Sequence, residues 1–385
     1  MRKWLMLLPI VLLTACAAPA KLPPPSLFND ALFAPPSTQV NAQDVFAVNQ
    51  PMRGYLSTAI VGQLHGKGYK QTLFDALYKK DGLRLEYDAV MTRNASEAFS
   101  ARSGNCLSLV IMTAAFAKEL NLEIQYQRVD TEEIWSRHGG LYFSSGHVNL
   151  VLGKRRFDID HSYDSNRLMT IDFLPPEEIL GQRVVSIDEN TIVAMYMNNR
   201  AAEALTLGKL DDAYWWAREA VMQDPKFLPG YNTLAVIYRQ TKHLTEAEQV
   251  LTHAIQLDPQ NLVVMSNLIQ VWKLVGKDAQ ANMLSQTLEK LQNYPPFYYF
   301  ERGISAIKKG DFRAARDFFI EEIKHAPDYH ESHFWLAIAY LKLGENKLAT
   351  EQLAIAKENS TTRSDYALYS AKLDRINAVN QHFLH

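Results

Sequence analysis

The sequence predicts an α+β domain followed by an all-α solenoid of helical repeats. Within residues 106–160 the hydrophobic pattern changes from helical to alternating, as expected where a central helix packs on an antiparallel sheet. From about residue 194 onward, small residues and glycines recur every 34 positions, which is typical of stacked pairs of helices. A chain of 385 residues is long enough for both parts.

Residues 1–15 are predicted to be a signal peptide. Arg2 and Lys3 supply positive charge, and the apolar stretch Trp4–Leu13 is shorter than the roughly 20 residues that a membrane-spanning helix needs. The stretch is followed by Thr-Ala-Cys, and together they resemble the signal of bacterial lipoproteins. This resemblance implies a lipid on Cys16. An ordinary secretory signal that contains a cysteine is the alternative.

The same segment predicts a location and a tether. Ala17 follows Cys16 at the position where a signal for inner-membrane retention would resemble Asp. We therefore expect a protein of the bacterial cell envelope, held in the outer membrane by its lipid alone and facing the periplasm. Residues 16–43 comprise the lipidated cysteine and a proline-rich tether, for which we expect an extended, solvated backbone.

Composition excludes one class of partner and singles out one thiol. The 40 basic and 42 acidic residues nearly cancel, whereas nucleic-acid binders usually show a basic surplus, so we expect no nucleic-acid partner. The chain has 2 cysteines, and lipidation of Cys16 would leave Cys106 as the only free thiol. Because most periplasmic cysteines are paired in disulfides, an unpaired thiol there is either buried and inert or reactive.

The α+β domain is predicted over residues 44–190. Its centre is the stretch Cys106–Leu120, which is apolar almost all round and therefore belongs in the middle of a domain. Further helices are expected at Arg53–Leu64, Tyr69–Lys80 and Thr92–Ala101, and extended segments at Leu83–Tyr87, Leu122–Val129, His147–Leu152 and Arg155–Asp160.

Cys106 begins the predicted central helix. Unpaired N–H groups and the dipole at a helix N-terminus favour a thiolate, and the same N–H groups can hold an oxyanion. Ser103, Gly104 and Asn105 supply a loop that would expose the sulfur. A buried, inert cysteine on an apolar helix is the alternative.

His147 and Asp160 are expected to face each other across a hairpin. Gly153-Lys154 suits a two-residue turn, because a type II′ turn requires glycine at its first central position. In this register His147 lies opposite Asp160, whereas Asp158 lies opposite Asn149. Directly opposed residues place their Cβ atoms about 4.5–5.5 Å apart on one face. We therefore expect Asp160 to orient the imidazole.

These residues lie in motifs that resemble the bacterial transglutaminase-like superfamily, whose fold is papain-like. The motifs are Thr92–Phe99, Arg102–Ser108, Gly146–Asn149 and Ile159-Asp160. Members of the superfamily include transglutaminases, peptidases and amidases. The resemblance implies Cys106 as the nucleophile, His147 as the general base and acid, and Asp160 as the orienting carboxylate.

A metal site is an alternative use of the same region, since imidazole and carboxylate suit several divalent ions. The candidate ligands are His147, Asp158, Asp160 and His161. His161 would point away from Asp160, however, because neighbours along a strand face opposite sides of a sheet. We therefore expect neither a metal nor another cofactor.

Five repeats are predicted over residues 194–363, with a capping helix at 364–381. The columns that recur every 34 residues are Ala213, Ala247, Ala281, Ala315 and Ala349, and Gly208, Gly276, Gly310 and Gly344, with Lys242 at the missing position. The small residues let two helices approach closely, and the glycines mark the turns between them. The pattern resembles tetratricopeptide repeats, which implies a surface for a polypeptide partner.

Together these predictions indicate acyl transfer on peptide or protein amides. Cys106 would attack the carbonyl, His147 would carry the proton, and Asp160 would hold the imidazole. Water as acceptor gives a peptidase or amidase, and an amine gives a transglutaminase-like enzyme; we favour hydrolysis, because no amine site is evident. The repeats would recruit the polypeptide. The competing hypothesis is a non-enzymatic periplasmic adaptor with a catalytically silent first domain.

Overall fold

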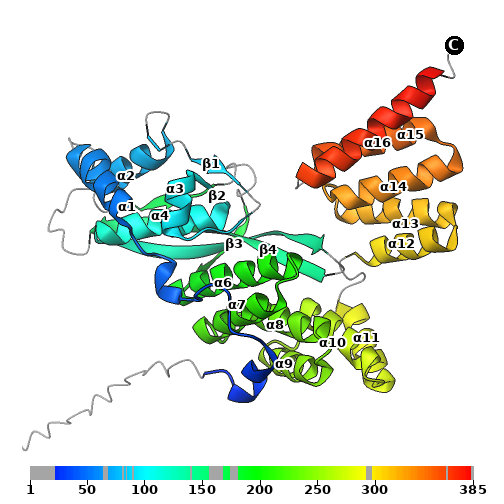
Figure 1. The fold of residues 1–385 in the computed structure, drawn as a ribbon, viewed down its shortest axis with the longest axis horizontal. Helices are drawn as coiled ribbons and strands as arrows, with labels where there is room; N and C mark the ends of the chain where they lie inside the picture. The colour runs from blue at the N-terminus through cyan, green and yellow to red at the C-terminus, as the bar shows by residue number, and fades with distance from the viewer. Residues whose placement is uncertain are drawn as a thin grey trace, which may run out of the picture.

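The computed structural model describes residues 22–63, 68–79, 82–83, 85–88, 91–138, 141–155, 168–173, 181–291, 297–360 and 363–382. Among these residues, helices, a four-stranded sheet and a short two-stranded sheet make up the N-terminal region, and helices follow from α6 (Glu189–Thr206) onward (Figure 1). The helical part begins at Glu189, a few residues before the first predicted repeat. The predicted signal peptide and Cys16 lie outside the described residues.

Helix α4 (Cys106–Glu119) is the centre of the N-terminal region. All its side chains from Leu107 to Ala117 are buried, which confirms the prediction of a helix without a polar face. It packs against strands β3 and β4, and also against helices α2, α3 and α6. The other elements before the sheet are η1 (Pro25–Leu27), η2 (Asp30–Leu32), η3 (Ala42–Asp44), α1 (Gln50–Tyr55), η4 (Leu56–Ile60), η5 (Val61–Gln63), α2 (Gly68–Tyr78), β1 (Glu86–Tyr87), α3 (Ala95–Ala101) and β2 (Ser103–Gly104).

The sheet is antiparallel and its strand order is β5–β4–β3–β6. The strands are β3 (Leu122–His138), β4 (Leu141–Arg155), β5 (Met169–Ile171) and β6 (Arg183–Ile187). β3 and β4 pair as far as His138 and Leu141, so they extend as a two-stranded ribbon beyond the part of the sheet that β5 and β6 flank (Figure 1).

The predicted hairpin turn at Gly153-Lys154 is wrong. Both residues lie inside β4, which pairs with β3 on either side of them, at Leu152 and at Arg155. Only one residue of β3, Glu123, lies opposite these two, so the irregularity is a β-bulge. A Cβ on Gly153 would lie 2.9 Å from the Cβ of Glu123. The glycine therefore permits a close approach of two strands and does not reverse the chain.

Five helix pairs and a final helix are present among the described residues from 189 to 382, as the 34-residue period predicts. The alanines that recur in the sequence are fully buried where each second helix begins, and Lys242 adopts a positive φ of 66° at the position that glycine holds in the other turns. The helices after α6 are α7 (Leu210–Gln223), α8 (Leu228–Gln240), α9 (Leu244–Leu257), α10 (Leu262–Leu274), α11 (Asp278–Leu291), α12 (Tyr298–Lys309), α13 (Phe312–His325), α14 (His330–Leu343), α15 (Asn346–Glu358) and α16 (Arg363–His382). None of the helices among the described residues is long and apolar enough to cross a membrane.

The first repeats share one hydrophobic core with the N-terminal region. This core runs from α4 and the sheet through α6 to Val271 in α10, whereas α12–α15 form a separate core around Phe300 and Phe319. The N-terminal region and the first repeats are therefore packed as one unit.

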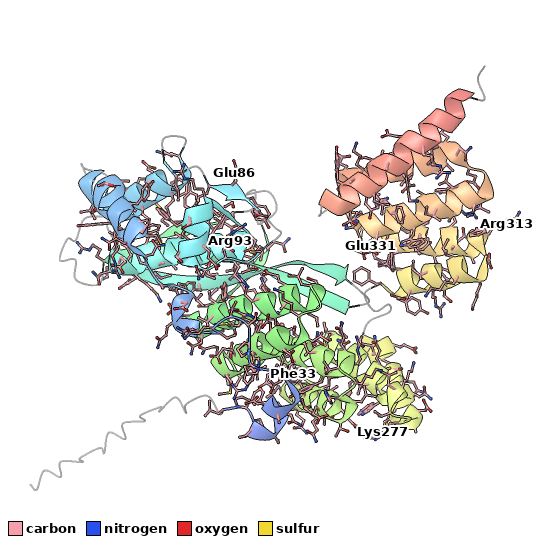
Figure 2. The ribbon with its side chains drawn as sticks, in the orientation of Figure 1. Phe33, Glu86, Arg93, Lys277, Arg313 and Glu331 are labelled. Carbon is pink, nitrogen blue, oxygen red and sulfur yellow. The ribbon has the colours of Figure 1, made fainter. Side chains whose placement is uncertain are left out.

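Residues 24–37, which we call the strap, lie along the first repeats (Figure 1). Phe33 lies beside the first helices of the solenoid (Figure 2) and is 8% exposed. Its ring stacks on Tyr214 of α7 with centroids 3.9 Å apart. Asp30 accepts a hydrogen bond of 2.6 Å from the Tyr214 hydroxyl, and Asn29 N–H donates to the Tyr238 hydroxyl at 2.8 Å. The prediction of a solvated tether is wrong for the strap, because Leu27 and Phe33 are buried in the core that the repeats share, and Phe28 and Leu32 pack against that core.

Candidate active site

Cys106 is the first residue of α4 and is half-buried. Asn105 caps the helix: its Oδ1 accepts a hydrogen bond of 2.9 Å from the N–H of Ser108. The first intrahelical bond is donated by Leu109 to the carbonyl oxygen of Asn105, at 3.0 Å. The N–H groups of Cys106 and Leu107 precede that bond, so they are available to a ligand beside the sulfur.

His147 lies in β4 and contacts both the thiol and a carboxylate. Its Nε2 is 2.6 Å from Oδ1 of Asp172, and Cys106 lies close enough to the ring to raise its pKa. Because Asp172 occupies Nε2, the other ring nitrogen, Nδ1, is the one left for the sulfur. The side chains of His147 and Asp172 are only 5% and 11% exposed. The structure therefore joins thiol, imidazole and carboxylate in one chain of contacts.

Strand pairing explains why Asp172 meets the imidazole. β5 pairs with β4 through Leu150 and Ile171, so one step further Asp172 comes beside Asn149. Asn149 and His147 share a face of β4, since side chains alternate along a strand. Asn149 donates from Nδ2 to Oδ2 of Asp172 at 2.7 Å, which leaves Oδ1 for the histidine.

Asp172 holds the position that the sequence assigned to Asp160. Asp160 itself lies outside the described residues, as do Asp158 and His161. The pairing that placed Asp160 opposite His147 required a turn at Gly153-Lys154. The structure has a β-bulge there, so the chain does not reverse at these residues. A sequence signal for Asp172 was present: Met-Thr-Ile-Asp at 169–172 is a short alternating segment that ends in Asp, like Phe-Asp-Ile-Asp at 157–160.

The surroundings of His147 hold its ring in the charged form. Burial alone lowers the pKa of His147, but the hydrogen bonds to Asp172 and Cys106, with the negative charges of both groups, outweigh burial and raise this pKa to about 9. His147 therefore stays protonated beside the sulfur at neutral pH.

Tyr87 is a further residue near the sulfur that the sequence did not single out. Its strand β1 pairs in parallel with β2, which places Tyr87 beside Gly104, and its side chain is 59% exposed. Burial raises the pKa of Tyr87, and the charge of Cys106 adds to this rise. Tyr87 is therefore an exposed side chain close to the candidate site.

The described residues hold no group of three or more His, Cys, Asp and Glu side chains arranged for a metal ion. Of the four candidate ligands, only His147 is described, and Asp172 and Cys106 take up its contacts. The arrangement suits proton transfer and nucleophilic attack by sulfur.

The raised pKa of His147 predicts a pH dependence of stability. The folded protein binds this proton more tightly than the unfolded chain, so the stabilisation is fully present below pH 6.5 and is lost as the pH rises through about 9. We expect the free energy of unfolding to fall by up to about 3 kcal/mol between pH 6 and pH 9.5. Urea unfolding at the two pH values measures this loss. His147→Gln should show a smaller loss, and an equal loss in both proteins would contradict the assignment.

Comparison with known proteins identifies the repeats. Models of the tetratricopeptide repeat match residues 228–261 and 300–362. These segments correspond to α8–α9 and α12–α15, so the solenoid consists of tetratricopeptide repeats, a module for protein interaction. No curated protein matches the chain significantly.

Solved structures of repeat proteins are similar to part of the chain. A chain of the APC/C heterotetramer Cut9–Hcn1 is 20% identical with a TM-score of 0.34; the match covers 49% of this chain and 37% of that one. A thermophilic repeat protein from Thermus thermophilus is 17% identical, covering 47% and 98%, with a TM-score of 0.35. YrrB, a repeat protein with an unusual peptide-binding site, is 18% identical, covering 47% and 92%, with a TM-score of 0.26.

Proposed function

We propose that this protein is a lipid-anchored envelope enzyme in which Cys106 transfers the acyl group of a peptide or protein amide to water. The observation that carries the proposal is the chain of contacts from Cys106 through His147 to Asp172. A thiol at a helix N-terminus, a charged imidazole and an orienting carboxylate are the groups that cysteine-dependent acyl transfer needs. A papain-like, transglutaminase-like origin of the N-terminal region is part of this proposal.

The reaction follows from these positions. Because the ring of His147 is cationic, it already carries the proton of the Cys106 thiol. The sulfur attacks the amide carbon as a thiolate, and the N–H groups at the start of α4 hold the developing oxyanion. His147 then gives the proton to the amine as the C–N bond breaks, which leaves a thioester. Water loses a proton to His147 and attacks the thioester, the C–S bond breaks, and the thiolate leaves beside the cationic ring, which restores the starting state. Asp172 keeps the ring oriented throughout.

The solenoid is proposed to recruit the substrate polypeptide. A bound polypeptide would have a high effective concentration near Cys106, because the first repeats and the N-terminal region share one core. The substrate would then be a protein or a long peptide in preference to a short amide.

The envelope location rests on the N-terminal sequence motif. If Cys16 carries the lipid, metabolic labelling with a fatty acid should mark the wild-type protein and not Cys16→Ser. Equal labelling of the two proteins would show that Cys16 does not carry the lipid, and would refute the proposed lipid anchor.

Alkylation of Cys106 tests the enzyme. At pH 6 an ordinary thiol is about 0.3% thiolate, so a thiolate stabilised by His147 should react with iodoacetamide at least ~30-fold faster than glutathione. His147→Ala should lose most of this excess, and Cys106→Ser should not be labelled. A wild-type rate equal to that of glutathione would refute the enzyme and leave the non-enzymatic adaptor.

A further inference from the structure

The cap of α4 is tied to a second loop through Thr92. Asn105, the cap residue, donates from Nδ2 to Oγ1 of Thr92 at 2.9 Å. Its Oδ1 accepts from both the N–H and the hydroxyl of Ser108, at 2.9 and 2.8 Å. The neighbouring N–H of Arg93 donates to the Ser108 hydroxyl at 2.8 Å. The orientation of Asn105, and with it the start of α4 at Cys106, thus depends on Thr92.

Thr92 is held in turn by α6, the first helix of the repeats. Its N–H donates to Oε1 of Glu203 at 2.6 Å, its hydroxyl oxygen accepts from Asn199 at 3.1 Å, and its carbonyl oxygen accepts from Arg200 at 3.2 Å. Thr92 is 1% exposed, so water does not replace these partners. Each polar group of Thr92 therefore has its partner on α6 of the solenoid or on the cap of α4.

The hydrogen bonds that the hydroxyl oxygen of Thr92 accepts restrict where its proton can be donated. Its oxygen accepts from two amide groups, those of Asn105 and Asn199, so its single proton has to point elsewhere. Glu203, which accepts from the N–H of Thr92, is the acceptor available to this proton. Glu203 must accept both the N–H and the O–H of Thr92, which a carboxylate does and a carboxamide does poorly.

The surroundings of Glu203 act on its pKa in both directions, and the net effect is a rise. Burial raises the pKa of Glu203, and the bonds from Thr92 and the charge of Arg200 oppose this rise. Nε of Arg200 lies 3.5 Å from Glu203, and NH1 of the same residue lies 3.8 Å from Glu97 of α3. Glu97 pushes the pKa of Glu203 upward but is itself partly exposed.

We propose that Glu203 of the solenoid is a positioning residue for Cys106, acting through Thr92 and Asn105. The inference rests on the proposed function and adds to it that the repeats complete the active site as well as recruiting polypeptide. Movement of α6 would change the contact between the Cys106 sulfur and His147. The repeats therefore contribute to the reactivity of the thiol.

The test is the rate of Cys106 alkylation by iodoacetamide between pH 5 and pH 9 in the full chain. We expect Glu203→Gln to react about tenfold more slowly at pH 6, the loss expected for one hydrogen bond to a charged group. We also expect its half-maximal rate at a higher pH than in the wild type. A defect in stability alone would not move the pH profile of the folded protein.

Matched variants separate positioning from folding. Thr92→Val lacks the hydroxyl and should reproduce Glu203→Gln, whereas Thr92→Ser keeps the hydroxyl and should restore the wild-type profile. Glu189→Gln is the control, since Glu189 joins the same helix to the N-terminal region through Lys118 and Tyr126, away from the α4 cap. It should leave the profile unchanged.

The outcomes distinguish this inference from the proposed function. If the wild-type thiol is reactive and both Glu203→Gln and Thr92→Val keep its pH profile, the positioning role is refuted and the enzyme stands. If Glu203→Gln fails to fold, the Thr92 pair decides alone. If the wild-type thiol reacts no faster than glutathione, the proposed function fails and the positioning role fails with it.

Discussion

Replacing Asp172 by alanine is expected to slow the alkylation of Cys106 at pH 7 by about 10- to 100-fold. The hydrogen bond to Asp172 is the strongest influence that raises the pKa of His147 against burial. Without it, burial favours the neutral ring and the sulfur loses its cationic neighbour. Turnover of an amide should fall further, about 10²- to 10⁴-fold, since loss of the orienting carboxylate has such effects in a serine protease.

Two variants sharpen this prediction. Asp172→Asn keeps an acceptor for His147 but removes the charge, so its rate should lie between those of the wild type and Asp172→Ala. Asp160→Ala should stay within about threefold of the wild type, because Asp172 occupies Nε2 of the ring. If Asp160→Ala were the slow variant and Asp172→Ala the normal one, the carboxylate of the site would be the residue expected from the sequence.

Phe33→Ala is expected to destabilise docking of the strap by about 3–5 kcal/mol, the usual cost of truncating a buried phenylalanine. The ring is buried and stacked on Tyr214 at an interplanar angle of 6°. Because about 1.4 kcal/mol corresponds to a factor of ten in an equilibrium, the open strap should become at least ~100-fold more populated. Limited proteolysis with thermolysin, with the cleavage sites identified by mass spectrometry, measures this population near Leu27 and Phe28.

Leu22→Ala is the matched control for the strap. Leu22 is 67% exposed, so its loss should leave the cleavage rate unchanged. Equal cleavage of Phe33→Ala and the wild type would show that the stacked ring does not hold the strap. Residues 24–37 would then be a solvated tether, as their prolines indicate.

The repeats could be predicted because their signal is local and recurs. A buried alanine such as Ala213 or Ala315 and a turn residue with positive φ are needed in every helix pair, so the same types recur at one period. The start of α4 was predictable for a similar reason: Asn105 is a capping residue directly before an apolar run.

The carboxylate of the site could not be predicted in this way. A glycine inside a strand is compatible with either a turn or a bulge, and the choice at Gly153 depends on how closely Glu123 of β3 approaches. Asp172 reaches His147 because β5 pairs with β4, and the two strands are separated in the chain. The alternating segment at 169–172 indicates a strand, but it does not show which strand is its partner.

The strap shows a similar limit. Its prolines favour extended backbone, and that conformation is equally suitable for solvent and for a protein surface. Burial of Phe33 depends on Tyr214 and Tyr238, which lie in the second and third helices of the solenoid. Their position relative to the N-terminus is set by the shared core and not by the strap itself.

A double-mutant cycle on His147 and Asp172 tests the central claim most directly. If Asp172 acts on the thiol only through the ring of His147, then the alkylation rate of Cys106 in His147→Ala/Asp172→Ala should equal that in His147→Ala alone. If the two single-variant factors instead multiply in the double variant, the two side chains act independently, and the proposed Cys106–His147–Asp172 unit is contradicted.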